Sequence, residues 1–519
     1  MARPIDFGGV NLTAGGDGAG ARPTAETPFC VAILGDFSGR GNRGISEAKT
    51  IGKRRAVLVD RDNFDEVLGR AGAAIQLPMG ESSSLELKFS ELEDFHPDRI
   101  FERLDVFGKL RGLRGRLADA ATFQKAAEEL GLGSGAAAAA PKKTGMTPVV
   151  APSAAKLASG SLLDDMIEQT EARLATEGPR RGTDEVGDFA RRMVAQHLVS
   201  NPDPRQPEIL KVVDRAIGGL MRAVLHNPDF QALEAAWQAA FLLVRQLETG
   251  SQLKLYLIDI SKEELAADLD SGKDLRDTGA YRLLVEQSVE TPGAEPWTLI
   301  VGNYSFGAGE EDAELLSGMA RIANRAGAVF LAGASPRLLG CAALESTPQP
   351  REWKAAEKSG GWSELRRRAE AGSVGLALPR FLLRLPYGKK TSTLETFEFE
   401  EFAEAPVHED YLWGNAAFAV ALLLGQAFSE AGWEMRPGSV AQMEKLPVHV
   451  YVTDGESQVK PCAEVLLTED AVERMVEAGV MPLVSFKGRE VVRVGRFQSI
   501  AEPLRGLAGR WVRWGKHSD

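Results

Sequence analysis

Three glycines that follow an apolar run give the chain a pattern known from dinucleotide-binding loops. Gly39, Gly41 and Gly44 have the spacing GxGxxG, and Asp60 closes a second apolar run roughly twenty residues later. In a dinucleotide-binding unit the last glycine opens a helix that crosses the sheet. The residues that follow here, ISEAKTIGKRR, contain few apolar side chains and end in consecutive basic residues. We therefore interpret the glycine pattern as a flexible loop and predict no nucleotide cofactor.

The basic run at the end of that stretch has two interpretations. Lys53, Arg54 and Arg55 are consecutive, and their side chains favour a solvated loop or strand edge. An acidic partner is the alternative.

The histidines and cysteines provide no basis for a metal site or a catalytic centre. No histidine has a His, Cys or carboxylate four residues on, with further ligands in support, as a helical metal site requires. His226 in LHNPDF is interpreted as a capping or packing residue at a helix break. The chain contains no GxSxG elbow and no P-loop. We predict that it is not an enzyme and binds neither metal nor cofactor. The isolated residues are His96, His197, His226, His408, His449, His517, Cys30, Cys341 and Cys462.

Two arginines stand in strongly apolar surroundings and need negatively charged partners. Arg380 and Arg384 occur in LPRFLLRLPYG, and the acidic run FEFEEFAE follows shortly after. We predict structural ion pairs of Arg380 and Arg384 with Glu398 and Glu400. A clamp for a substrate carboxylate is the alternative. In DFQALEAAW, Glu234 and Trp237 share one helix face and are further polar groups in an apolar segment.

The composition is that of a globular protein with several domains. The chain has 519 residues, of which 44% are hydrophobic and 26% charged. A net charge of −12 argues against nucleic-acid binding, which needs clustered Lys and Arg. The longest apolar runs fall short of the roughly 20 residues that cross a bilayer, and the N-terminus lacks an apolar signal region. We expect a cytoplasmic protein without membrane insertion.

Strands and helices alternate in two blocks joined by a stretch that has neither aromatic nor acidic residues. In the first block, the runs CVAILGDF and AVLVD predict strands, and residues 96–130 have helical spacing. In the second, LKLYLIDI, WTLIVGNY and AVFLAGA predict buried parallel strands separated by helices. The predicted fold is therefore α/β and α+β: a small α+β domain tethered to a larger α/β domain. The predicted parts are an arm at 1–28, the small domain at 29–130, a linker at 131–160, a helical region at 161–250 and the large domain at 251–519.

Segments of both blocks resemble the contractile sheath of the bacterial type VI secretion system. VAILGDFSGR, DRDNFDEVL and LELKFSELEDFHPDRIFERL are similar to its small subunit (TssB, VipA). LHNPDFQALEAAWQAAFLLV, LIVGNYSFG, VGLALPRFLLRLPYG and MPLVSFKGRE are similar to its large subunit (TssC, VipB), in the expected order. The resemblance implies a structural, non-enzymatic protein that assembles with itself or with other sheath-type subunits. It also implies contacts with an inner tube, a baseplate and a sheath-recycling unfoldase.

Three further expectations depend on this resemblance. The segment SLLDDMIEQT takes the place of a helix read by the unfoldase, with Leu162, Leu163, Met166 and Ile167 as candidate contacts. An N-terminal arm with Ile5, Phe7 and Val10 is a candidate for interlocking neighbouring protomers by strand addition. The large-subunit resemblance stops near Phe497, so the family's C-terminal interlocking part is expected to be absent.

Three functions remain open from the sequence. The first is a fused sheath protomer that pairs small- and large-subunit parts in one chain. The second is a shortened paralogue that modifies, caps or adapts a sheath or baseplate. The third is a ligand-binding or enzymatic α/β protein on a sheath-like scaffold, which would show a solvent-open pocket formed by Arg380, Arg384 and acidic residues.

Overall fold

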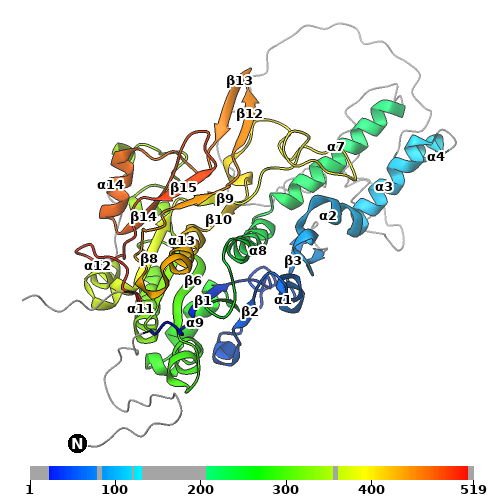
Figure 1. Cartoon of the computed structure of the whole chain (residues 1–519). Coiled ribbons are helices and arrows are strands. Elements are labelled where there is room, and N and C mark those ends of the chain that lie inside the picture. The colour runs from blue at the N-terminus through cyan, green and yellow to red at the C-terminus, as the bar shows by residue number, and fades with distance from the viewer. Residues whose placement is uncertain (1–22, 79–83, 120–121, 131–205, 355–359, 512–519) are drawn as a thin grey trace, which may run out of the picture.

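A computed structural model describes residues 23–78, 84–119, 122–130, 206–354 and 360–511 (Figure 1). The predicted linker, the candidate arm with Ile5, Phe7 and Val10, and the candidate helix with Leu162, Leu163, Met166 and Ile167 lie outside these residues.

One large sheet runs through the described part of the chain and contains strands from both blocks. Its nine strands have the order β11-β15-β14-β8-β7-β6-β1-β5-β2. The six strands from β14 to β5 are parallel, whereas β2, β15 and β11 pair antiparallel to their neighbours. The strands are β1 (Phe29–Gly35), β2 (Val57–Val59), β5 (Leu253–Asp259), β6 (Trp297–Phe306), β7 (Val329–Ala334), β8 (Val374–Leu378), β11 (Gln442–Glu444), β14 (Val480–Ser485) and β15 (Val491–Val494).

The first block does not form a sheet of its own around its first strand. All seven residues of β1 are buried, and the strand lies between β5 and β6 of the second block. Side chains of a strand point alternately to opposite faces, so Val31 and Ile33 enter one core while Ala32 and Leu34 enter the other. A strand that is apolar on both faces needs strand neighbours on both edges and cover on both faces. The second block supplies both neighbouring strands.

Helices cover the two faces of this sheet and define the two cores. The core that contains Val31 is closed by α1 (Phe64–Ala71), α2 (Pro97–Arg103), α3 (Asp105–Ala118), α4 (Phe123–Glu129), α7 (Gln206–Leu225), α8 (Pro228–Gln246) and α13 (Ala416–Ala431). The core that contains Ala32 is closed by α9 (Lys262–Ser271), α10 (Gly279–Tyr281) with the π-helix that continues it (Arg282–Glu290), α11 (Glu310–Ala326), α12 (Gly360–Arg367) and α14 (Glu469–Glu477).

Three two-stranded sheets complete the described structure. They are β3 (Ala74–Pro78) with β4 (Ser84–Lys88), β9 (Phe381–Leu382) with β10 (Trp413–Gly414), and β12 (His449–Thr453) with β13 (Glu456–Lys460). The hairpin β12–β13 projects at the top of Figure 1.

The central helix α13 is the most apolar element of the second block. Among the described residues, the stretch Ala416–Glu434 is long and apolar enough to cross a membrane by length and composition, but two thirds of it is buried inside the protein. Twelve of the sixteen residues of α13 are buried, and the helix packs against β6, β7, β8 and α8. Its hydrophobicity is therefore explained by its central position in the core.

The fold class expected from the sequence is confirmed: the chain combines an α/β sheet with α+β parts. The run LKLYLIDI becomes β5, and AVFLAGA becomes β7. The described residues of the helical region predicted at 161–250 form two helices, because Asn227 caps α8 through its side chain and Pro228 occupies the first helical position.

Candidate functional site

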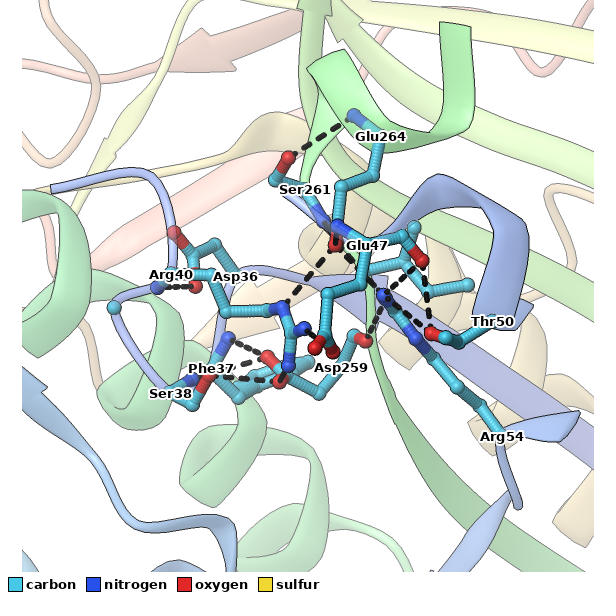
Figure 2. Close-up of polar contacts among 12 residues, drawn as sticks. Asp36, Phe37, Ser38, Arg40, Glu47, Thr50, Arg54, Asp259, Ser261 and Glu264 are labelled. Atoms are coloured by element: carbon cyan, nitrogen blue, oxygen red, sulfur yellow. Dashed lines mark hydrogen bonds and ion pairs between the residues drawn. The ribbon is translucent and has the colours of Figure 1, made fainter. Parts of the chain in front are cut away.

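The two sequence blocks meet along the full length of β1. The register with β5 is parallel from Phe29↔Leu253 to Gly35↔Asp259, and β6 pairs with β1 from the other side. The backbone of β1 thus exchanges hydrogen bonds with strands that lie more than 200 residues away in the sequence. Beyond its last residue, a group of charged side chains from both blocks surrounds the carboxyl ends of β1 and β5 (Figure 2).

The glycine loop after β1 is closed by a carboxylate of its own. Asp36 Oδ1 accepts a hydrogen bond from the Arg40 backbone N–H at 2.6 Å, and Asp36 Oδ2 accepts one from Gly41 at 2.8 Å. These amides face Asp36, in a loop whose pattern suggested phosphate binding. Burial raises the pKa of Asp36, although the same two amides oppose that rise. Gly39 has φ +74°, and a Cβ at this position would lie 2.2 Å from the carbonyl oxygen of Ala74, so only glycine fits. The expectation of a flexible loop is replaced by a hydrogen-bonded turn.

Asp259, at the end of β5, binds the residues that directly follow β1. Its Oδ1 accepts from the backbone N–H groups of Phe37 at 2.9 Å and Ser38 at 3.0 Å, while its Oδ2 accepts from the Ser38 hydroxyl at 2.7 Å. A single carboxylate of the second block therefore satisfies three donors of the first. This arrangement fixes where the glycine loop leaves the sheet.

Glu264 is the most deeply buried charged residue at the contact between the two blocks, and its side chain is fully buried. Its Oε1 lies 2.7 Å from Arg54 Nη2 and 3.3 Å from Arg40 Nε, and its Oε2 lies 2.9 Å from Arg54 Nη1. The Glu47 backbone N–H also donates to Oε1 at 2.7 Å. Glu264 is the third residue of α9 and forms a capping box with Ser261, so the start of this helix fixes the carboxylate.

The hydrogen bonds to Glu264 outweigh the effect of its burial. Burial alone raises the pKa of a carboxyl group, but the bonds from Arg54 and from the Glu47 and Ser261 backbone N–H groups lower the pKa of Glu264 to about 2. Burial lowers the pKa of Arg40, and the charge of Glu264 reverses that effect and raises it. Both groups remain ionised over the physiological range.

Aromatic side chains extend the contact into the core. Trp237 of α8 is completely buried and donates its indole N–H to the carbonyl oxygen of Phe37 at 2.9 Å. The rings of Phe37 and Phe64 both pack edge-on against Trp237, with centroids 5.2 and 5.7 Å away. Two rings of the first block therefore enclose one ring of the second, and the indole N–H fixes their relative position.

A second buried ionic cluster lies within the second block and contains one of the predicted arginines. Arg384 Nε is 2.8 Å from Glu234 Oε1, and Arg384 Nη1 is 2.8 Å from Glu401 Oε2. His226 also lies here, with Nε2 3.6 Å from Glu401 Oε1. Burial raises the pKa of Glu401, but the charge of Arg384 outweighs it and lowers the pKa to about 2. His226 is a buried packing residue at the break between α7 and α8, as predicted.

The predicted partners of the arginines need correction. Glu398 lies 3.2 Å from Lys389 Nζ, Glu400 accepts from the Lys389 backbone N–H, and both side chains point outward. The chain is extended here with alternating burial, so Phe399 and Glu401 face the core while Glu398 and Glu400 face solvent. Glu401 belongs to the predicted acidic run and, together with Glu234, is the partner of Arg384.

Arg380 does not join this cluster. Its guanidinium lies 2.6 Å from Glu464 and 3.1 Å from Glu409. Glu464 follows β13 by a few residues and is remote in sequence, so no local pattern around Arg380 indicated it.

The interpretation of the basic run was wrong for one of its residues. Arg54 is only 12% exposed and pairs with Glu264, whereas a solvated loop was favoured. The missed signal lies in the second block, because the sequence SKEE at the start of α9 predicts a capping box and hence a fixed glutamate.

Two family models match the chain, and together they cover both blocks. The model "VipB: EvpB/VC_A0108, tail sheath N-terminal domain" matches residues 207–501, more than half of the chain. The model "Type VI secretion system, VipA, VC_A0107 or Hcp2" matches residues 10–130. The boundary between the matches falls in the stretch predicted as a linker and helical region.

Two curated proteins of Pseudomonas aeruginosa (strain PAO1) show the same division. The type VI secretion system sheath protein TssC1 is 32% identical over 335 residues, which are 62% of this chain and 67% of TssC1. The sheath protein TssB1 is 27% identical over 110 residues, which are 20% of this chain and 62% of TssB1. The strands that β1 joins therefore belong to the TssC-like part, and β1 itself belongs to the TssB-like part. The chain is a member of the type VI secretion sheath family, with a TssB/VipA-like part and a TssC/VipB-like part in one polypeptide.

Proposed function

We propose that this chain is a single-polypeptide sheath protomer, in which the small-subunit part and the large-subunit part pair within one molecule. The observation that supports this most directly is the position of β1, which is a central strand of a sheet whose other parallel strands all come from the large-subunit part. Removal of β1 from the centre of the sheet would expose the apolar cores on both faces of the sheet. The two parts therefore act as one structural unit.

Fusion changes how often the two parts meet. Two surfaces on one chain encounter each other at an effective concentration in roughly the millimolar range. Separate subunits at cellular concentrations pair only as fast as diffusion and expression levels permit. A fused protomer therefore keeps the two parts at a fixed 1:1 ratio, which suits a structural unit of a regular assembly.

The partners that follow are other copies of this chain or separate sheath subunits. An inner tube, a baseplate and a sheath-recycling unfoldase that reads Leu163 and Met166 are further proposed partners, and the proposed location is the cytoplasm. A modifying, capping or adapting role at a sheath or baseplate is the second candidate.

Cleavage of the linker tests the pairing. A protease site inserted within residues 131–160 of the purified chain allows the two parts to be separated covalently. We expect both fragments to elute together in size-exclusion chromatography and to keep the native far-UV circular dichroism spectrum. Separate elution of two folded fragments would contradict pairing through β1.

Electron microscopy tests the assembly. Negative-stain images of the full chain, alone and mixed with separate TssB and TssC subunits, distinguish the candidates. Tubes formed by the chain alone support the sheath protomer. Particles found only at the ends of tubes made by the other subunits support a cap, and discrete particles in both samples contradict both roles in the sheath.

A further inference from the structure

A cavity of about 480 Å³ lies at the carboxyl ends of three neighbouring parallel strands of the large sheet. The ends of β6, β7 and β8 contribute Asn303, Gly333 and Ala377 to its wall. Open α/β sheets bind ligands in this place, and the volume falls within the range of small-molecule sites. The cavity is distinct from the contact at β1, since none of its lining residues belongs to the first block.

Local irregularity in the sheet opens this cavity. The pairing of β6 with β7 shifts register between Val301 and Ser305, so β6 bulges there before the strands pair again at Ser305↔Gly333 and Phe306↔Ala334. Asn415 lies at this bulge, where its Nδ2 donates to the carbonyl oxygen of Tyr304 at 2.9 Å. Alanines contribute small side chains to the wall and leave space between the larger apolar groups Leu344, Leu378 and Trp413. The alanines are Ala232, Ala235, Ala334, Ala342, Ala343, Ala377 and Ala416.

Two polar side chains in the wall have unused hydrogen-bonding capacity. Within the described residues, the Asn303 side-chain amide has no hydrogen-bond partner. Arg380 donates through Nε and Nη2, whereas its Nη1 has no partner in the described part of the chain. Its side chain is 40% exposed, so its free donors are accessible. An arginine with donors to spare is the preferred group for binding a planar carboxylate.

The acidic neighbours of Arg380 leave room for such a ligand. Glu464 already accepts from the backbone and side chain of Arg380 and lies 3.3 Å from His408 Nε2. His408 Nδ1 in turn lies 2.6 Å from Lys460 Nζ. Lys460 therefore adds a second basic side chain, besides Arg380, next to Glu464. Glu409 is 65% exposed, and an exposed ion pair of this kind contributes little stability. A ligand carboxylate can replace Glu409 on the guanidinium at small cost.

We propose that this cavity binds a small organic carboxylate, with an apolar or aromatic body against the alanine-lined wall and the carboxylate on Arg380. Asn303 supplies a hydrogen bond to a polar substituent of the body. The inference does not depend on the proposed sheath function, because the lining residues all belong to the large-subunit part. It corresponds in part to the pocket expected for a ligand-binding α/β protein, although Arg384 lies outside it, fully engaged with Glu234 and Glu401.

Three probes with the same ring test the proposal on the full chain. Benzoate, benzamide and benzylamine present an anionic, a neutral and a cationic group on one body, and calorimetry measures the Kd of each. We expect benzoate to bind most tightly. We also expect the substitution Arg380→Gln to weaken benzoate binding by about tenfold or more, since charge-assisted hydrogen bonds are lost.

A blocking variant and a surface variant complete the test. Ala232 is an exposed residue of α8 at the cavity wall, so Ala232→Trp fills the cavity without removing a contact and should abolish binding. It keeps the test valid if Arg380→Gln fails to fold. Arg368 forms an ion pair with Glu364 outside the cavity, so Arg368→Gln should bind benzoate as the unmodified chain does. Equal affinity for the three probes, unchanged binding in Ala232→Trp, or no binding of any probe at millimolar concentration would overturn the proposal.

Discussion

Two buried ionic clusters use the same chemistry for different connections. In the first, Arg40 and Arg54 of the small-subunit part converge on Glu264 of the large-subunit part. In the second, Arg384 lies between Glu234 and Glu401, all within the large-subunit part. The first cluster places two arginines around one fully buried carboxylate. The second places one arginine between two buried carboxylates.

The excess charge is placed differently in the two clusters. In the first cluster the excess charge is positive, and the two arginine side chains that carry it are 12–15% exposed. Glu47 and Asp259 pair with Arg40 at the edge of this cluster. In the second, both carboxylates are almost completely buried, with exposures of 0% and 1%. A buried charge that loses its partner has no access to water, whereas an exposed one does. We therefore expect the first cluster to act mainly on the pairing of the two parts and the second mainly on the stability of the large part.

Removal of Arg384 should have the largest effect. The substitution Arg384→Met leaves Glu234 and Glu401 buried without a counter-charge, which costs about 3 to 5 kcal/mol of unfolding free energy. Urea denaturation followed by circular dichroism measures this loss. Arg368→Met, at an exposed pair, is the matched control and should change the free energy little. A loss below about 1 kcal/mol for Arg384→Met would show that the cluster relaxes or admits water.

Removal of Glu264 should have a smaller effect on stability and a specific effect on pairing. The substitution Glu264→Gln costs about 1 to 3 kcal/mol, because Arg40 and Arg54 retain some access to solvent. After cleavage within the linker, the affinity between the two fragments should fall about tenfold or more.

Glu47→Gln is the control for this experiment. Glu47 pairs with Arg40 at 2.8 Å, but its side chain is 58% exposed. The fragments of this variant should associate almost as tightly as those of the unmodified chain. Equal weakening by Glu264→Gln and Glu47→Gln would contradict the special role of the buried carboxylate.

Acid should loosen the pairing of the cleaved fragments in a defined window. The pKa of Glu264 is lowered from 4.5 to about 2 mainly by its bonds to Arg54 and the Glu47 N–H of the first block, with a further bond from the Ser261 N–H. The paired state therefore binds fewer protons than the separated state between these values. The stabilisation from Glu264 is fully present above pH 4.5 and is lost as the pH falls toward 2. The affinity measured across this range should drop less in Glu264→Gln than in the unmodified chain. Parallel pH profiles would indicate that other carboxylates carry the effect.

The sequence predicted which segments form strands better than it predicted which strands lie next to each other in the sheet. The apolar runs of β1, β5 and β7 are unbroken, so each was recognised as a buried strand. The run of β1 gave no sign of which strands flank it, since apolar pairing is nonspecific and its neighbours lie beyond position 250. For this reason the first block was expected to be a self-contained domain, although its first strand completes the sheet of the second.

The charged contacts were predictable only in part. Glu234 and Arg384 stood out because each is polar in an apolar segment; Glu234 is fully buried, and the Arg384 side chain is 14% exposed. Arg54 did not stand out, because three basic residues in a row resemble a solvated surface. Its burial depends on its ion pair with Glu264, which lies more than 200 residues away in the sequence. The residues around Arg54 give no indication of a partner so far along the chain.

The smallest expected effect concerns the acidic run itself. Glu398 and Glu401 differ by three positions, yet one is 87% exposed beside Lys389 and the other is 1% exposed beside Arg384. Glu398→Gln should change the unfolding free energy by less than about 0.5 kcal/mol, as is usual for an exposed pair. Glu401→Gln removes the charge opposite Arg384 and leaves one carbonyl oxygen where two carboxylate oxygens accept from Arg384 and the Tyr387 N–H, so its cost should be several times larger. Equal costs measured by urea denaturation would mean that the alternation of buried and exposed residues along 397–401 does not hold in solution.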